Sequence, residues 1–255
     1  MFFGLFWGDT TILVLIPAMI FAFWAQFKVN STFNQYAKVY NRRGLTGAEA
    51  ARRVLDANGL HNVTIEHIRG HLTDHYDPRA NVIRLSDASY ASTKTNVIRL
   101  SDAVYDSHSV ASIGVACHEA GHAVQYAQGY APIKLRSAII PLTRFGSFLA
   151  MPLFLIGLLM GSGSYLGYGI GTIFMVTGIL FFSFSTLFQL VTLPTEFNAS
   201  ARAMKALEDG GLLADDELPA AKATLSAAAM TYVAALATSL ASLLRLILIF
   251  NNRRR

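Results

Sequence analysis

Charged residues are scarce in this chain of 255 residues: Asp, Glu, Lys and Arg make up 15% of it, while 53% of the residues are hydrophobic. Soluble domains carry about 25% charged residues, so the composition argues against a wholly soluble globule and against a disordered chain. A single cysteine, Cys117, excludes an internal disulfide and a four-cysteine zinc site. The net charge of +5 in so apolar a chain is more typical of membrane orientation than of nucleic-acid binding, so we expect no nucleic-acid partner.

Long apolar stretches account for the shortage of charge. The first has no charged residue between Thr10 and Phe27 and can cross about 30 Å of hydrocarbon. A cleaved signal peptide is the alternative, but no Lys or Arg precedes Lys28 and no small-residue cleavage pattern follows, so we favour a retained helix. The chain therefore predicts about four transmembrane helices in a lipid bilayer. The stretches are about Asp9–Phe27, Phe145–Gly161, Tyr165–Leu193 and, more weakly, Met230–Phe250.

Hydropathy divides the chain into five parts. A Gly/Ser-rich turn at 160–164 joins the second and third apolar stretches, which predicts a helical hairpin in the membrane. The last stretch can continue a helix that starts near Pro219, as one rod longer than a bilayer is thick. The expected parts are an N-terminal transmembrane helix at 1–27, a polar region at 28–144, the hairpin at 145–193, a second polar region at 194–229, and a hydrophobic helix with a basic tail at 230–255.

The larger polar region has the pattern of a small α+β domain. Thr46 and Glu49 form a capping box that opens a helix through Leu55, and Gly59 ends it. The later elements are expected as strands at Val63–Ile68 and Val82–Leu85, a turn at Tyr76-Asp77-Pro78 between them, and a helix rich in Ala and Gly from about Ser109 to Gln128.

An eight-residue sequence, NVIRLSDA, occurs twice, at 81–88 and at 96–103. Identity over so many consecutive residues indicates a tandem duplication or an insertion. Two copies are too few for a solenoid, which needs at least three stacked units. The plain interpretation is a lengthened loop or an added hairpin.

His118-Glu119-Ala120-Gly121-His122 is an HExxH sequence in the last predicted helix of this region. Residues four apart share a helix face, about 6 Å apart along the axis, so two imidazoles can bind one Zn²⁺ while Glu119 projects beside them. Zinc lowers the pKa of a water, and Glu119 would take its proton as general base while the water attacks a peptide carbonyl. Helix histidines without a metal are the alternative, but the long Ala/Gly-rich helix favours the metal interpretation.

A catalytic zinc needs a third protein ligand and keeps one position open. No histidine follows His122, which excludes an HExxHxxGxxH arrangement, so a downstream carboxylate is expected. Glu196 is favoured because it opens a helical pattern directly after the third apolar stretch and Pro194; a plain carboxylate at a helix N-terminus is the alternative. The other candidates lie in a Gly-rich acidic stretch typical of a solvated loop and helix start: Glu208, Asp209, Asp215, Asp216 and Glu217.

Four segments carry a family resemblance, in chain order LTDHYDP, VIRLSDAVYDSHSVASIGVA, HEAGHAVQ and LPTEFNASARA. With them, the chain resembles the YugP-like membrane zinc metallopeptidases over nearly its whole length. The resemblance implies a bacterial, membrane-bound, zinc-dependent endopeptidase. A more distant similarity to HtpX-like membrane proteases, whose third ligand lies in a Glu-x-x-Ala-Asp motif, implies Glu196 as ligand: Ala199 matches, but Ser200 stands where Asp is expected. Asn198 or Ser200 is therefore a candidate to orient a zinc histidine by a hydrogen bond.

Pattern and resemblance together predict an α-helical membrane protein with a small α+β, zincin-like metallopeptidase domain that holds one catalytic zinc ion. Family members have a single VIRLSDxVY segment before the HExxH helix, so one copy of the repeat is extra here. In zinc peptidases generally, the strand ahead of the catalytic helix is an edge that pairs with substrate. We expect one copy to keep this role while the other forms an adjoining strand or a displaced loop.

The remaining histidines and the cysteine have weaker expected roles. His108 could approach the site as an oxyanion donor or cap the helix. Cys117 adjoins a ligand but would point off the metal face, so we expect a buried small hydrophobe. His61 and His67 are expected on the surface or in strands. His71 and His75 are also four residues apart, but they lie in a strand-turn region, where this spacing makes no common face for a metal.

Basic residues set the expected orientation in the cell (inner) membrane. With four spans, both polar regions lie on one side of the bilayer, where most Lys and Arg near the membrane ends gather, so the active site is predicted to face the cytoplasm. The basic tail at 253–255 opposes this unless the last helix fails to cross.

Glu196 closely follows an apolar stretch, so the zinc is expected near the membrane surface and the substrates are expected to be membrane-proximal polypeptides, such as loops or termini of membrane proteins. A non-catalytic metal-binding membrane scaffold (a pseudo-protease) is one alternative, and a membrane structural protein with an incidental HEAGH is another. No pattern indicates a regulatory partner or an oligomeric state.

Overall fold

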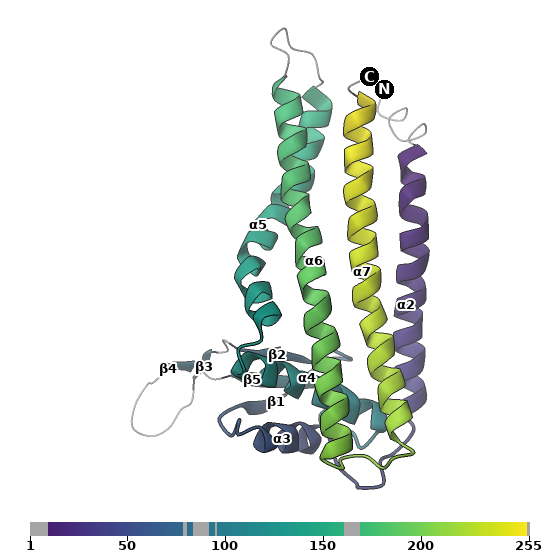
Figure 1. Cartoon of the computed structure of the whole chain (residues 1–255), viewed down its shortest axis with the longest axis vertical. Helices are drawn as coiled ribbons and strands as arrows, with labels where there is room; N and C mark the ends of the chain where they lie inside the picture. Colours follow the sequence, from purple (N-terminus) through teal and green to yellow (C-terminus); the bar gives the residue numbers. More distant parts are fainter. Residues whose placement is uncertain (1–9, 79–80, 84–91, 95, 161–168, 254–255) are drawn as a thin grey trace. The chain divides into compact units, whose positions relative to one another are not determined.

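The computed structural model describes residues 10–78, 81–83, 92–94, 96–160 and 169–253. Over these residues the protein is mostly helical, with a three-stranded and a two-stranded sheet (Figure 1). The chain forms two compact units: a helical unit of Met1–Gln26, Leu135–Pro194 and Met230–Arg255, and a site unit of Phe27–Lys134 and Thr195–Ala229. The turn predicted at 160–164 lies, apart from Met160, outside the described residues.

Within the part of the chain that the structure describes, four helices are long and apolar enough to cross a membrane, as the sequence predicts. The first is α2, preceded by a short 3₁₀ turn, η1. These helices expose many large apolar side chains, such as Phe23, Phe148 and Leu159. Such exposure fits a lipid environment better than water. The helices and the turn are η1 (Thr10–Val14), α2 (Leu15–Tyr36), α5 (Ala131–Met160), α6 (Ile170–Asp209) and α7 (Leu218–Arg253).

Small residues let the helices of the helical unit pack closely. A β-carbon on Gly178 of α6 would lie 2.7 Å from the carbonyl oxygen of Ala150 on α5, so the two backbones touch there. Phe154, Met175 and Leu246 form the buried core of this unit, one from each of α5, α6 and α7.

The expectation that a new helix opens near Glu196 is wrong. Helix α6 continues through Pro194 to Asp209, so Glu196 lies well inside a helix of 40 residues. A proline removes one backbone N–H from the ladder, and α6 accommodates this loss and continues on both sides of Pro194. The prediction of a single rod beginning near Pro219 is confirmed, since α7 starts at Leu218 and runs for 36 residues.

The site unit contains a three-stranded sheet in the order β1-β5-β2. The central strand β5 (Val97–Ser101) pairs parallel with β1 (Thr64–Ile68) and antiparallel with β2 (His75–Asp77). Tyr76 and Asp77, predicted in a turn, therefore belong to a strand, and the turn begins only at Pro78. Of the three residues expected in the turn, only Pro78 is a turn residue, because pairing with β5 extends the strand through Asp77.

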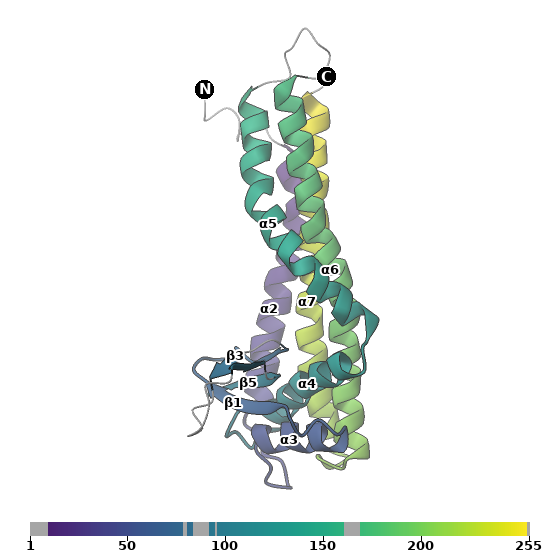
Figure 2. The same ribbon diagram turned by 90° about the vertical axis from the view of Figure 1, so that its left-hand side faces the viewer.

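Two helices, α3 (Gly47–Ala57) and α4 (Val110–Ala127), lie beside one another and pack against the sheet (Figure 2). The predicted capping box is present: the Thr46 hydroxyl accepts from the Glu49 backbone N–H at 3.1 Å, and the Glu49 carboxylate accepts from the Thr46 N–H at 2.9 Å. Ser109 caps α4 by accepting from the Ser112 N–H at 3.1 Å. A continuous apolar core that includes Leu55, Ile98 and Ile113 joins these layers.

The two copies of the repeat have different structures. The second copy supplies β5, which is paired on both sides, so the expectation that the strand ahead of the HExxH helix is a substrate-binding edge is wrong. In the first copy, Asn81–Ile83 form β3, which pairs with β4 (Ser92–Lys94) in a separate two-stranded sheet. The rest of the first copy lies outside the described residues. Among the strands described, the edges of the three-stranded sheet are β1 and β2.

Candidate metal centre

The two histidines of the HExxH sequence lie one turn apart on α4. Their ring centroids are 4.7 Å apart and the rings are nearly perpendicular, at 86°. Between them, Gly121 faces α6: a β-carbon there would lie 2.8 Å from the carbonyl oxygen of Ala199. The absence of a side chain at position 121 therefore lets α6 approach the histidine face of α4.

Glu196 on α6 lies between the two imidazoles. Its Oε2 is 3.2 Å from Nε2 of His118 and 3.3 Å from Nε2 of His122, and its side chain is only 2% exposed. One ligand atom from each of the three residues lies within 4.8 Å of the others. Two imidazole nitrogens and a carboxylate oxygen in a buried cluster match the donor set of a catalytic zinc, which also keeps one position open. The residues present therefore fit a single Zn²⁺ ion.

The other candidate carboxylates do not join this cluster. Within the described residues, His118, His122 and Glu196 are the one group that could hold a metal ion in this way. Glu217 is buried elsewhere, where its carboxylate accepts backbone N–H groups from Arg42 and Ala214 at 2.8 Å each. Asp216 pairs with the Arg42 guanidinium. Because α6 begins at Ile170, the alternative interpretation of Glu196 as a carboxylate at a helix N-terminus is also wrong.

Each candidate zinc histidine has a partner at its other ring nitrogen. The Ser200 hydroxyl lies 3.1 Å from Nδ1 of His118, so the serine that replaces the expected aspartate can orient this ring. The Oε1 atom of Gln125 lies 3.0 Å from Nδ1 of His122. The Oδ1 atom of Asn198 instead accepts from Gln125 Nε2 at 2.9 Å, so Asn198 is one residue removed from His122. Gln125 was missed, although its place three residues after His122 puts it on the same helix face.

Glu119, the glutamate of the HExxH sequence, is buried and only 8% exposed. Burial raises the pKa of its carboxyl, and the nearby carboxylates of Glu196 and Asp74 act in the same direction, while the two histidines oppose them. A carboxylate held in this way binds a proton more tightly than one in water.

Asp74 comes from the loop before β2 and is itself held in place. It accepts from the Ser101 backbone N–H at 2.7 Å and from the Ser101 hydroxyl at 3.0 Å. The sequence pattern did not single out Asp74, because its relation to Glu119 depends on how β5 lies beside α4.

The structure does not bring His108 to the centre. Its Nδ1 lies 3.0 Å from the carbonyl oxygen of Gly44, beyond the N-terminal end of α4, and eight helical residues separate that end from His118, roughly 12 Å along the axis.

Cys117 is fully buried, and burial raises its thiol pKa to about 12, which bears out the expectation of a small hydrophobe. His67 and His61 pair with Asp102 and Asp56 on the surface.

An HExxH helix with a buried downstream glutamate between its histidines is the ligand arrangement of a zinc peptidase. The family described as "Putative neutral zinc metallopeptidase" matches residues 11–95 and 92–251, and the two matched segments overlap at 92–95, between the two copies of the repeat. The "Putative membrane protease YugP" of Bacillus subtilis (strain 168) is 45% identical over 243 residues, which cover 95% of this chain and 97% of the relative. The chain belongs to this metallopeptidase family. No solved structure matches it.

Proposed function

We propose that the protein is a zinc-dependent membrane endopeptidase. The observation that carries the proposal is the convergence of His118, His122 and Glu196, with every ligand atom within 4.8 Å of the others. Membership of a zinc metallopeptidase family and the similarity to a membrane protease support the same conclusion.

The three side chains would hold one Zn²⁺ and leave a position open toward substrate. When bound, zinc supplies Lewis-acid chemistry that activates water and polarises a peptide carbonyl. Glu119 accepts the proton of the attacking water at its carboxylate and delivers it to the nitrogen of the departing amine. Its burial supports this role, because the raised pKa of the carboxyl lets it hold that proton between the two transfers. Ser200 and Gln125 keep the two imidazoles turned toward Glu196.

The catalytic region in this proposal consists of residues 28–144 together with 194–229, and its arrangement is zincin-like. A zincin sets an HExxH helix beside a small sheet and takes the third ligand from a later helix. Helix α4, the sheet β1-β5-β2 and α6 supply these parts here. Because β5 is the central strand, an added substrate strand would pair at β1 or β2.

We further propose that the substrates are membrane-proximal polypeptides, and that the protein lies in the inner membrane with its catalytic region in the cytoplasm. Four helices with the composition of membrane spans support the location. Glu196 follows the apolar stretch that ends at Leu193 by three residues, which supports a site close to the lipid surface. The concentration of Lys and Arg in the two polar regions supports the orientation.

A paired protease assay tests the enzyme proposal. Full-length wild type and Glu119→Gln, purified in detergent, are incubated with an unfolded membrane-protein substrate, and zinc is quantified in both. We expect the variant to keep its zinc and to lose cleavage by about 10²–10⁴-fold, the usual contribution of a general acid–base group. Equal cleavage by both proteins would contradict the enzyme proposal, and zinc without cleavage in wild type would favour the non-catalytic scaffold.

A further inference from the structure

Gln125 is fully buried, and both hydrogens and the oxygen of its amide have hydrogen-bond partners. Its Nε2 group donates to the backbone carbonyl of Thr195 at 2.8 Å and to Oδ1 of Asn198 at 2.9 Å. Both amide hydrogens are therefore occupied, and Oε1 is left facing Nδ1 of His122 at 3.0 Å. An oxygen in this place can only accept, so His122 carries a proton on Nδ1 and presents Nε2 toward Glu196. That is the form in which an imidazole binds a metal through Nε2.

Two acceptors hold the Gln125 amide in this orientation: the Thr195 carbonyl, which can only accept, and the Asn198 oxygen, which can be turned away. An asparagine amide can face a neighbour with either its oxygen or its NH₂ group, and the wrong choice would set two donors against each other. The Nε–H of Arg202 donates to Oδ1 of Asn198 at 2.7 Å. A guanidinium has donors and no acceptor, so the Asn198 oxygen must face Arg202, and the same oxygen then accepts from Gln125.

We infer that Arg202 is a positioning residue for the metal centre, acting through Asn198 and Gln125 on His122. The inference deepens the proposed function, because it assumes that His122 binds zinc. In this chain of contacts each member permits one orientation of the next. Arg202 fixes Asn198, Asn198 holds Gln125 together with the Thr195 carbonyl, and Gln125 fixes the proton on Nδ1 of His122. The consequence is a metal site whose affinity depends on a side chain that touches no ligand.

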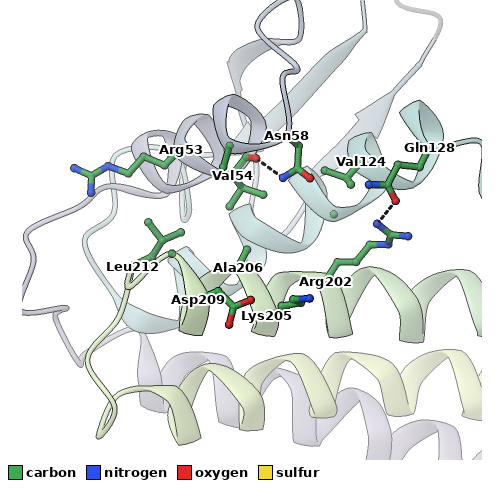
Figure 3. Close-up of a pocket in the computed structure, with 13 residues that line it drawn as sticks. Arg53, Val54, Asn58, Val124, Gln128, Arg202, Lys205, Ala206, Asp209 and Leu212 are labelled. Carbon is green, nitrogen blue, oxygen red and sulfur yellow. Dashed lines mark hydrogen bonds between the residues drawn. The ribbon is translucent and has the colours of Figure 1, made fainter.

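Arg202 also has a contact that offers a purely structural explanation. Its Nη1 donates to Oε1 of Gln128 at 2.7 Å, which ties α6 to the C-terminal end of α4. Both side chains line a cavity of about 530 Å³. Figure 3 shows them pointing toward each other on its wall. Methionine is unbranched and shorter than arginine, so Arg202→Met removes the guanidinium and adds no volume beside this cavity. The Gln128 contact can be removed separately, so the two roles can be distinguished.

Zinc affinity of the full-length protein in detergent, measured by competition with a chelator, tests the inference. We expect Arg202→Met to weaken zinc binding by about 10–100-fold, the usual effect of losing a group that orients a ligand. Gln128→Leu, the matched control, removes the contact between the helices and leaves Arg202 on Asn198, so its affinity should stay near that of wild type. The double variant Asn198→Asp with Arg202→Met should recover affinity, because a carboxylate presents an acceptor to Gln125 in either orientation.

The outcomes separate the inference from the proposed function. A wild-type protein that binds no zinc would contradict the proposed function. If wild type binds zinc and Arg202→Met binds it equally well, Arg202 has no positioning role. Equal weakening in Gln128→Leu, or failure of the double variant to recover, would assign Arg202 to helix attachment alone and overturn the inference. Thermal unfolding identifies any variant that does not fold; should Arg202→Met be one, Asn198→Leu cuts the same chain of contacts and must weaken zinc binding.

Discussion

Gly121 and Ala199 meet backbone to backbone where α4 and α6 approach each other: a β-carbon on the glycine would lie 2.8 Å from the alanine carbonyl oxygen. Gly121 stands directly before His122, and Ala199 follows Glu196 by three residues. The close approach therefore sets how near the Glu196 carboxylate comes to the imidazoles.

A side chain at position 121 should damage the metal centre. Gly121→Ala forces the two helices apart or strains them, at a cost of about 1–3 kcal/mol in unfolding free energy, and we expect weaker zinc binding. Gly114→Ala is the matched control on the same helix, since its β-carbon would find its nearest neighbour at 3.8 Å, an ordinary contact. That variant should be neutral or more stable by up to about 1 kcal/mol. Zinc titration and thermal unfolding measure both; equal behaviour would show that the approach is not needed.

Glu196 should be essential for metal binding. In Glu196→Gln a neutral amide replaces the anionic oxygen between the histidines. Zinc affinity should therefore fall by more than the roughly 10–100-fold that is typical of losing a residue that only orients a metal ligand. Glu208→Gln makes the same change at an exposed position of the same helix and should have no effect. Metal analysis after dialysis against a weak chelator compares the two. Full zinc retention in Glu196→Gln would rule this glutamate out as a ligand.

Cys117 should be dispensable despite its place beside His118. The thiol is fully buried and burial raises its pKa to about 12, so a thiol reagent should label it only after unfolding. Cys117→Ala should keep a full complement of zinc. Rapid labelling of the native protein, or loss of zinc in the variant, would refute this prediction.

The first copy of the repeat should be removable. Asp77 of β2 pairs opposite Val97 of β5, so deleting residues 81–95 leaves 78–80 and 96 as a four-residue connection between antiparallel strands. Hairpin loops of this length are common, so the sheet and the HExxH helix should form as before. Zinc content, thermal unfolding and cleavage should stay close to wild type. A deletion variant that folds and binds zinc but no longer cleaves would show that the insertion acts on substrate.

Local signals predicted the parts of the site that lie on one helix. The Ser109 cap and the spacing of His118 and His122 depend on neighbours within a few residues, and the sequence specifies both. Glu196 was predicted as a ligand because a catalytic zinc needs a third protein ligand and this glutamate comes directly after an apolar stretch. The helix expected to begin there does not, because α6 runs unbroken through Pro194.

Contacts between distant segments account for what the sequence did not predict. Gln125 has the spacing of a partner for His122, but its importance depends on Thr195 and Asn198, which α6 brings from 70 residues away or more. Identical sequences in the repeat likewise give a buried central strand in one copy and part of a separate sheet in the other. Both copies have the same pattern of apolar and polar residues, so the strands with which each copy pairs decide its position in the fold.

The most direct test is to locate the metal in the full-length protein by anomalous diffraction recorded on both sides of the zinc absorption edge. The structure predicts one zinc peak per chain, enclosed by His118, His122 and Glu196. A protein that contains zinc but shows its peak elsewhere, or one in which Glu196 lies apart from the metal, would contradict the proposed site.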